Sequence, residues 1–224
     1  MDLGGQDSFP EQRKELVSWL KKGGYIRREA MAQAVLRVPR EQFVPPRLRE
    51  LSYTENPLPI PGENATISCV HTYCICYEAL GLEEGHRFLE VGLGSGYGAA
   101  LAQEVVGPHG KVVSIELDPR TYRYGDANLK RCGYQDVVTV QGDGSEGHAD
   151  MAPYDRVAIS AACPWEPTAV MEQVRRPGGI VFPLGGEGRQ QLMLMEVDEE
   201  GRWSREALAD VVYVPLRGKH GWHS

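Results

Sequence analysis

Apolar residues near the start of the chain recur at the spacing of a helix. Between residues 10 and 46 they form two stripes, the first at Leu16, Val17, Trp19 and Leu20 and the second at Ala30, Ala34, Val35 and Val38. This periodicity predicts two amphipathic helices, the second closed by Pro39, because proline cannot continue a helix. Five further prolines lie between residues 45 and 62. They predict an ordered but irregular connector, since each proline fixes φ and lacks a backbone donor.

Beyond residue 85 the pattern changes to short β-rich runs separated by segments long enough for a helix. The runs are residues 88–91, 112–115, 137–140, 157–159 and 180–182. This alternation is typical of βαβ units around a parallel sheet. The last two apolar runs, 192–197 and 211–214, are joined by the charged turn 198–201 without a helix. They predict an antiparallel hairpin at one edge of the sheet.

Length and charge narrow the classes of protein that fit. A chain of 224 residues with 42% apolar content suits one α/β domain. We expect residues 1–84 to form an N-terminal helical cap and residues 85–224 to form the sheet domain, as one integrated globular unit. The formal net charge of -7 gives no reason to expect a nucleic-acid partner, because binding to phosphates requires a basic surface.

The sequence also predicts where the protein resides. No stretch approaches the roughly 18 consecutive apolar residues of a membrane span, and residues 1–5 lack the features of a signal peptide. We therefore expect a cytoplasmic protein without membrane contact. The five cysteines cannot all pair within one chain, and reduced thiols are the expectation for that compartment.

A glycine-rich turn follows the run 88–91. Gly92, Gly94 and Gly96 alternate there, which allows a sharp turn and close approach of a ligand to the backbone. Their spacing differs from the G-x-G-x-x-G of a dinucleotide site, and Glu90 would repel a pyrophosphate. A carboxylate at this position suits the ammonium group of S-adenosylmethionine, either directly or through water. Tight packing of a helix on the sheet is the alternative explanation of the glycines.

Two more acids end the next predicted strands. Glu116 follows Gly96 by twenty residues, where a carboxylate can accept hydrogen bonds from both ribose hydroxyls. Asp143, followed by Gly144, ends the third strand and could accept from the adenine amino group. Each acid alone could be a helix N-cap. Together, acids at the ends of three successive strands predict one cofactor site.

The motifs as a set resemble those of the protein-L-isoaspartate O-methyltransferase family. The matching segments are residues 38–45, Tyr53, 56–60, 65–68, 89–97, 142–144, 154–167, 177–179, 183–185 and 214–216. The resemblance implies a Rossmann-like methyltransferase fold, with a mostly parallel seven-strand sheet, an antiparallel C-terminal hairpin and a helical N-terminal cap. It also implies methyl transfer from S-adenosylmethionine to the α-carboxylate of L-isoaspartyl residues in damaged proteins or peptides, leaving S-adenosylhomocysteine. We expect a monomer.

The family's reactive loop falls on residues 66–68, and its active-site serine corresponds to Ser68. A carboxylate is already a nucleophile at neutral pH, so Ser68 is expected to orient the acceptor and not to ionise. The alternative is that Ser68 caps a helix starting near Val70. The resemblance also places Thr66, Ile67, Tyr73 and Gly144 at the cofactor, and Ile67 and Val214 at the substrate.

The segment after Ser68 departs from the family. Members usually continue with Ala-Pro or Gln-Pro, whereas this chain has Cys69-Val70, and Tyr73 replaces a histidine found in some members. The departure leaves open a carboxyl methyltransferase for another peptide or small molecule. A nicotinamide-dependent oxidoreductase and a non-catalytic cofactor-binding scaffold are less favoured alternatives.

Cysteine and histidine in this segment are also the usual zinc ligands. The residues in question are Cys69, His71, Cys74 and Cys76. Their spacing matches no standard zinc motif, and in a helix Cys74 would point away from the face shared by Cys69 and Cys76. We therefore expect no metal, and buried, reduced cysteines.

Overall fold

A seven-stranded sheet organises the computed structural model, which describes residues 8–186 and 188–222. The strand order is β5-β4-β3-β6-β7-β8-β9. The strands are β3 Arg87–Val91, β4 Lys111–Glu116, β5 Val138–Gln141, β6 Tyr154–Ile159, β7 Val174–Leu184, β8 Gln190–Val197 and β9 Trp203–Val211. The pairs from β5 to β7 are parallel, and β7, β8 and β9 pair antiparallel. The predicted parallel sheet with an antiparallel edge is confirmed.

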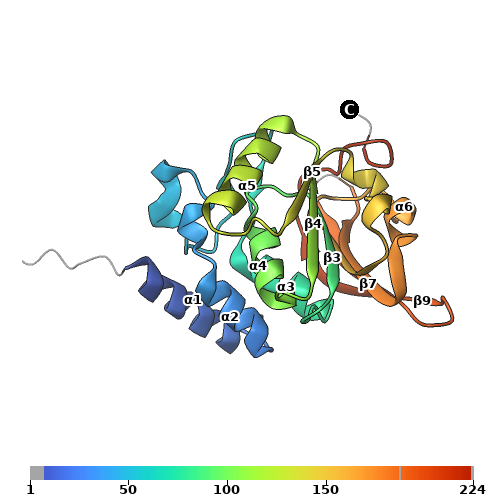
Figure 1. Ribbon diagram of the computed structural model, residues 1–224, viewed down its shortest axis with the longest axis horizontal. Helices are drawn as coiled ribbons and strands as arrows, with labels where there is room; N and C mark the ends of the chain where they lie inside the picture. The colour runs from blue at the N-terminus through green and yellow to red at the C-terminus, as the bar shows by residue number, and fades with distance from the viewer. Residues whose placement is uncertain (1–7, 187, 223–224) are drawn as a thin grey trace, which may run out of the picture.

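Helices cover both faces of the sheet (Figure 1). The helices α3 Val70–Ala79, α4 Tyr97–Val106 and α5 Pro119–Arg131 lie on one face, and the short α6 Thr168–Met171 lies on the other. Side chains alternate along each strand. Phe88 and Val112 therefore join the apolar core under α4, while their neighbours Leu89 and Val113 join the core on the α6 side.

The two predicted N-terminal helices are present as α1 Phe9–Lys22 and α2 Glu29–Arg37. Helix α2 packs on α4 and α1 packs on α2, so they form an outer layer beyond the helices on the sheet (Figure 1). Helix α2 ends two residues before Pro39, because the residue before a proline is disfavoured in helical conformation. No helix within the described ranges is long and apolar enough to cross a bilayer.

The proline-rich connector is irregular, as predicted, but contains short regular pieces. These are the 3-10 helix η2 Pro46–Leu51 and the two-residue strand β1 Leu58–Pro59. The 3-10 helix η1 Arg40–Gln42 precedes the connector, and the two-residue strand β2 Thr66–Ile67 follows it. Strands β1 and β2 pair antiparallel, with Pro59 opposite Thr66. A Cβ built on Gly94 would lie 3.9 Å from the Thr66 carbonyl oxygen. The connector therefore holds the predicted reactive loop directly above the glycine-rich turn.

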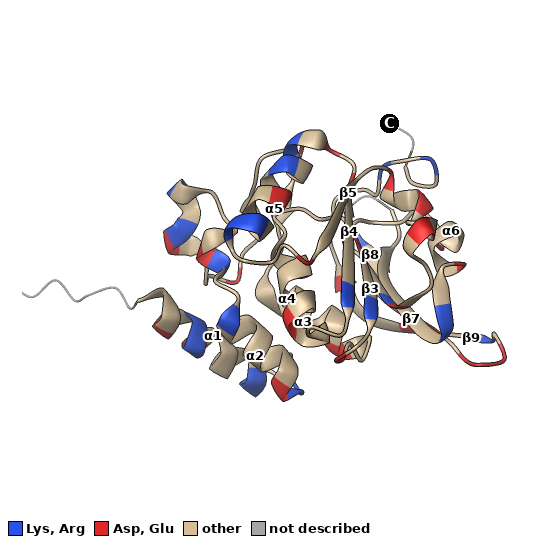
Figure 2. Cartoon of the chain, viewed as in Figure 1, with Lys and Arg blue, Asp and Glu red and all other residues tan. Residues whose placement is uncertain are grey.

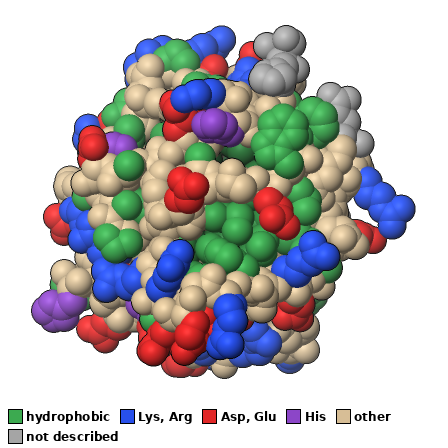
Figure 3. Space-filling model, turned by 90° about the vertical axis from the view of Figure 1, so that its right-hand side faces the viewer, with side chains coloured by type: hydrophobic (Ala, Val, Ile, Leu, Met, Phe, Trp, Pro, Cys, Tyr) green, Lys and Arg blue, Asp and Glu red, His purple; other side chains and the backbone are tan. Residues whose placement is uncertain are grey.

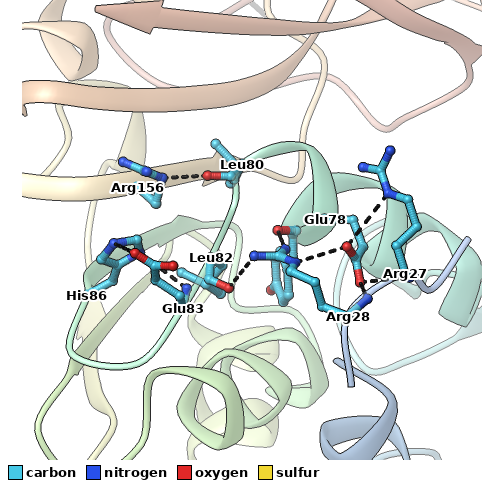
Figure 4. A network of polar contacts seen from close by, with 9 residues as sticks. Arg27, Arg28, Glu78, Leu80, Leu82, Glu83, His86 and Arg156 are labelled. Carbon is cyan, nitrogen blue, oxygen red and sulfur yellow. Dashed lines mark hydrogen bonds and ion pairs between the residues drawn. The ribbon is translucent and has the colours of Figure 1, made fainter. Parts of the chain in front are cut away.

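Helix α3 is fixed at its C-terminal end by a polar network (Figure 4). The Glu78 carboxylate is buried and accepts from the backbone amide and Nε of Arg28, both at 3.0 Å. The Arg28 guanidinium also donates to the Tyr77 carbonyl oxygen at 2.7 Å. Arg156, on β6, donates to the Leu80 carbonyl. These donors satisfy carbonyl groups that the end of a helix leaves unpaired, and they tie α3 to the start of α2 and to the sheet.

The position of the last strand was predicted wrongly. We expected residues 211–214, but β9 spans Trp203–Val211, and Val197 pairs with Trp203 directly across the turn. Strand β9 lies at the sheet edge, where polar side chains can face solvent, so it lacks the apolar run that we sought. The residues after it cross the carboxyl ends of the strands, where the Ala162 amide donates to the Val214 carbonyl at 2.7 Å.

Candidate cofactor and acceptor site

A cavity of about 510 Å³ opens at the carboxyl ends of β3, β4 and β6. Its walls come from the turns after these strands, the segment from Glu63 to Tyr73 that includes the reactive loop and the start of α3, and the segment from Asp210 to Arg217. Open α/β sheets bind ligands at this edge, and the volume is typical of small-molecule sites. Of the residues predicted for the site, those that line the cavity are Thr66, Ser68, Tyr73, Gly92, Gly94, Glu116, Gly144 and Val214. Ile67, Glu90, Gly96 and Asp143 do not.

The three glycines of the turn have different roles. Gly92 and Gly94 line the cavity with φ of +100° and +55°, in the region that favours glycine. Gly96 precedes α4, and a Cβ there would lie 2.9 Å from the Gly125 carbonyl oxygen of α5. Gly96 therefore allows two helices to pack closely, which is the alternative explanation that we gave for the glycines. Gly92 and Gly94 expose backbone to a ligand.

Glu116 presents its carboxylate at the cavity from the end of β4. Its Oε2 accepts from the Gly94 amide at 3.0 Å, and its Oε1 accepts from the Asp118 amide at 3.1 Å. Partial burial raises the pKa of Glu116, and the hydrogen bonds from these amides oppose that rise. The side chain is thus held in place by the glycine turn and has further lone pairs for a ligand.

Glu90 lies behind the cavity wall and not in it. Its carboxyl group is buried, with the Ser114 hydroxyl donating to Oε2 at 2.6 Å and the Tyr77 hydroxyl donating to Oε1 at 3.4 Å. Burial raises the pKa of Glu90 to about 8. A direct contact with a ligand ammonium group, one of the two options we considered, is therefore not formed by this geometry.

Asp143 turns toward the C-terminal segment. Its Oδ1 accepts from the amide and hydroxyl of Ser145 at 2.9 and 2.6 Å, and its Oδ2 accepts from the Lys219 amide at 2.7 Å. These hydrogen bonds lower the pKa of Asp143. The carboxylate thus caps the 3-10 helix Gly144–Glu146. The adenine contact that we predicted for it has no support in this arrangement.

The reactive loop presents alternate residues to the cavity. Thr66 and Ser68 line it, whereas Ile67 is fully buried in the core, because successive side chains of an extended segment point to opposite sides. The Tyr73 hydroxyl lies beside the amide and hydroxyl of Ser68, and burial raises the pKa of Tyr73 to about 12. Tyr73 is therefore neutral and closes the wall behind Ser68.

Ser68 does not cap helix α3. The residue preceding the helix is Cys69, and the first helical amides of Val70 and His71 donate to the Glu55 carboxylate at 3.1 Å each. Glu55, thirteen residues before Ser68, therefore caps the helix. Sequence reasoning missed Glu55, because a cap supplied from a distant segment leaves no local pattern. The Ser68 hydroxyl remains available to the cavity.

Arg40 is a second residue that sequence reasoning missed. Its side chain is fully buried, its Nε donates to the Ser52 carbonyl at 2.6 Å, and its guanidinium carbon lies 5.2 Å above the Tyr97 ring centroid. Among the described residues, Nη1 and Nη2 have no hydrogen-bond partner. The positive charge opposes the burial that raises the pKa of Cys69 and Tyr73. The Arg40 guanidinium therefore contributes a positive electrostatic potential at two residues of the cavity wall.

Carboxylates outnumber basic side chains around the cavity. Four carboxylates line it, Glu63, Glu116, Asp118 and Asp210, against the basic Arg217 and His71; the other ionisable residues of the lining are Cys69, Tyr73 and Tyr213. Arg217 is already paired, because its Nη1 lies 2.9 Å from Glu63 Oε2. The lining therefore favours a ligand with positive charge. Val214 lies at the rim with 41% of its surface exposed.

The cysteines after Ser68 do not gather around a common point. Cys74 and Cys76 are buried in the apolar core, and burial raises the pKa of Cys76 to about 12. Cys69 lies outside the helix and lines the cavity. In the part of the chain that the structure describes, no group of three His, Cys, Asp or Glu side chains could hold a metal ion. The thiols are unpaired.

Comparisons with known proteins identify the family. The sequence model for protein-L-isoaspartate(D-aspartate) O-methyltransferases matches residues 11–221. The protein-L-isoaspartate O-methyltransferase of Methanopyrus kandleri is 42% identical over 215 residues, covering 96% of this chain and 95% of the relative. That of Hyperthermus butylicus is 41% identical over 225 residues, covering 97% and 93%.

Solved structures agree on the fold. A protein-L-isoaspartate O-methyltransferase superposes with a TM-score of 0.81 at 28% identity, covering 93% of this chain and 67% of the other. A structure from Plasmodium falciparum with bound S-adenosyl-L-homocysteine gives a TM-score of 0.80 at 20% identity, covering 92% and 98%. With the family match spanning nearly the whole sequence, the chain belongs to the protein-L-isoaspartate(D-aspartate) O-methyltransferase family.

Proposed function

We propose that the protein transfers a methyl group from S-adenosylmethionine to the α-carboxylate of L-isoaspartyl residues in proteins or peptides. The backbone nitrogen of the isoaspartyl linkage then attacks the ester carbonyl and releases methanol, and hydrolysis of the resulting succinimide can give normal aspartate. The observation that carries the proposal is the family match over residues 11–221. The cavity agrees with it, because one wall holds Glu116 of the sheet and another holds Ser68 of the reactive loop.

The cavity residues fit S-adenosylmethionine. Glu116 would accept from the ribose hydroxyls, and the backbone of Gly92 and Gly94 would allow close approach. The acidic lining suits the sulfonium and ammonium charges. When bound, S-adenosylmethionine supplies an electrophilic methyl group on a positively charged sulfur atom.

The acceptor side requires orientation more than proton transfer. A carboxylate is ionised at neutral pH and needs no base. Ser68 would donate its hydroxyl hydrogen to one carboxylate oxygen and fix the direction of the other. Arg40, behind Cys69 and Tyr73, would contribute a positive potential that favours an anionic acceptor in an otherwise acidic cavity.

The departure after Ser68 does not favour another acceptor. Helix α3 begins at Val70 although the usual proline is missing, and Glu55 holds that end of the helix. The start of the helix is therefore held without the proline.

We also infer that the protein acts as a cytoplasmic monomer. Arg205 and Glu206 are exposed on the edge strand β9, and charges at a sheet edge disfavour pairing with another chain. Unpaired cysteines suit a reducing compartment.

A repair assay tests the proposal. An L-isoaspartyl peptide is incubated with enzyme and S-adenosylmethionine, and the linkage is followed by reversed-phase chromatography. We expect the isoaspartyl peptide to decline while the succinimide and the normal aspartyl peptide accumulate. An isoaspartyl peptide that stays unchanged, with active S-adenosylmethionine present, would contradict the proposal.

A further inference from the structure

Two exposed valines lie at the rim of the cavity, directly after the edge strand β9. Val212 and Val214 both line the cavity, with 74% and 41% of their surfaces exposed. Single exposed apolar residues are common on protein surfaces. These two differ because they belong to one segment, two positions apart, and border the cavity that Ser68 also lines. We call residues 212–214 the rim segment.

Tyr213 places the rim segment next to Ser68. Burial raises the pKa of Tyr213 well above its ordinary value. The side chains of Cys76, Tyr73 and Cys69 lie close enough to raise it further. Cys69 follows Ser68 in the chain, and the Tyr73 hydroxyl lies beside the Ser68 hydroxyl. The Tyr213 side chain therefore points into the wall that carries Ser68, while the two valines on either side of it face outward.

Hydrogen bonds hold the rim segment but leave the backbone of Val212 free. The Tyr213 amide donates to Oε1 of the buried Gln190 on β8 at 2.7 Å. The Val214 carbonyl accepts from the Ala162 amide at 2.7 Å. Among the described residues, no hydrogen bond reaches the amide or the carbonyl of Val212.

The free groups of Val212 lie on the open side of the sheet. In an extended segment, the backbone groups of successive residues point to opposite sides. Because the Tyr213 amide faces β8, the amide and carbonyl of Val212 face away from it. Strand β9 is the last in the sheet order, so no strand of this chain covers that side.

We propose that the acceptor polypeptide leaves the cavity along the rim segment as an added strand. One residue that flanks the isoaspartyl residue exchanges hydrogen bonds with the amide and carbonyl of Val212, and the added strand covers Val212 and Val214. This inference rests on the proposed function, because the isoaspartyl residue is the point from which the strand extends. A polypeptide is the occupant, since an open strand edge pairs with main-chain amide groups.

Backbone pairing also fits the task of a repair enzyme. The hydrogen bonds of an added strand involve main-chain groups and read no side chain. An acceptor bound in this way can vary in sequence around the isoaspartyl residue. The exposed valines add apolar contact that does not require one particular partner side chain.

The charges of β9 confine the pairing to the end of the edge at the cavity. Arg205 and Glu206 are exposed in the first part of the strand, where charges disfavour pairing. The register with β8 shifts at Leu208, which has no partner on β8, and such a bulge interrupts an edge. Asp210 lies nearer the cavity, and its carboxylate is 3.5 Å from the Arg189 guanidinium.

The experiment compares acceptors of different length. One peptide has blocked ends and a single residue on each side of the isoaspartyl residue, and two others are extended by three residues on the N-terminal or the C-terminal side. KM and kcat are measured for the wild type, Val212→Ser and Leu51→Ser. Leu51 is the matched control, because it is 45% exposed and does not line the cavity. Extended peptides with one N-methyl group, moved along successive added residues, test the backbone pairing.

We expect the wild type to have a KM about ten- to thirtyfold lower for one extended peptide than for the short one. Val212→Ser should reduce this ratio about threefold, and Leu51→Ser should keep it. N-methylation should raise KM at one position and leave it unchanged at the next, because successive amides point to opposite sides. These ratios do not depend on the fraction of folded enzyme.

Equal KM values for short and extended peptides in the wild type would overturn the added strand and leave the proposed function intact. So would an unchanged ratio in Val212→Ser, or an equal effect of N-methylation at successive positions. A dimer of the wild type in analytical ultracentrifugation that dissociates in Val212→Ser would assign this edge to a second copy and would also overturn it. A failure to methylate any isoaspartyl peptide would overturn the proposed function as well.

Discussion

Glu116 is the carboxylate that we propose as the ligand of the cofactor ribose. It lines the cavity and is oriented by the Gly94 and Asp118 amides. Glu116→Ala removes hydrogen bonds to a charged acceptor, worth on the order of 1.5 to 3 kcal/mol each. We expect calorimetry with S-adenosylhomocysteine to show a dissociation constant at least tenfold higher. Asp143→Asn is the control, and an equal loss of affinity there would restore the adenine contact that the geometry does not support.

We propose that Ser68 acts at the acceptor and not on the fold. Glu55 caps α3, so Ser68→Ala should keep its melting temperature and its affinity for S-adenosylhomocysteine. The lost hydrogen bond to a carboxylate, about 1.5 to 3 kcal/mol in the transition state, predicts a rate roughly ten- to a few hundredfold lower. Single-turnover kinetics on isoaspartyl peptide measure the rate of methyl transfer in Ser68→Ala and the wild type. Full activity in a stable variant would remove Ser68 from the mechanism.

The buried carboxyl of Glu90 predicts a pH dependence of stability. Burial raises the pKa of Glu90 from 4.5 to about 8. Between these values the folded protein keeps a proton that the unfolded chain releases, so stability falls as pH rises, by at most about 1.4 kcal/mol per pH unit. Denaturant unfolding of the cofactor-free protein from pH 5 to 8 should show this decline. The stability of Glu90→Gln should change less with pH over the same range. Parallel curves of stability against pH for the variant and the wild type would contradict a raised pKa of Glu90.

Residue types and spacing predicted which residues line the cavity better than they predicted side-chain directions. The positions of Glu116, Gly92 and Gly94 follow from a strand that leads into a turn. The directions of Glu90 and Asp143 do not, because they depend on partners such as Ser114 and Lys219 from other segments. Arg40 was overlooked for the same reason, since its environment exists only after folding.

At the scale of elements, α3 links the fold to the reactive loop. Its N-terminal amides bind Glu55, and its C-terminal end is held by the Glu78 and Arg28 pair. Glu55→Gln should weaken the cap by about 1 kcal/mol and loosen the loop that carries Ser68. We therefore expect a higher KM for isoaspartyl peptide with an unchanged affinity for S-adenosylhomocysteine.

Glu78→Gln is the matched change at the opposite end of α3. It removes the charge of the buried Glu78 carboxylate, whose partner Arg28 is partly exposed, so it should cost somewhat more stability, on the order of 2 kcal/mol, yet leave the KM of the folded fraction near that of the wild type. Melting curves and steady-state kinetics on both variants separate the effects. Equal KM values for Glu55→Gln and wild type would show that the cap does not position the loop.

Elements whose apolar residues recur at a regular spacing were predicted from the sequence. Elements that depend on tertiary contacts were not. Helices α1 and α2 and the strands from β3 to β8 follow from apolar spacing. We predicted the wrong residues for strand β9, because polar residues at the sheet edge obscure the alternation of apolar and polar side chains. The short β1–β2 pair could not be predicted, since two residues per strand carry no periodic signal.

At the scale of the whole molecule, one apolar core joins the N-terminal helices to the sheet. It contains Leu20 of α1, Leu101 of α4 and Phe88 of β3. The division between residues 84 and 85 stays a prediction, and this core runs across it. Basic and acidic residues are interspersed along the helices (Figure 2). On the face shown in Figure 3, hydrophobic side chains gather near the centre and charged ones surround them.

The central claim is that the cavity brings a methyl donor to an isoaspartyl carboxylate. The most direct test incubates the enzyme with methyl-labelled S-adenosylmethionine and two peptides that differ only in an L-isoaspartyl or an L-aspartyl linkage. The product is quantified as label released by base, because a methyl ester is base-labile. We predict base-labile label on the isoaspartyl peptide and none above background on the aspartyl peptide, with a strong reduction in Ser68→Ala. Equal labelling of both peptides, or label that resists base, would contradict the account.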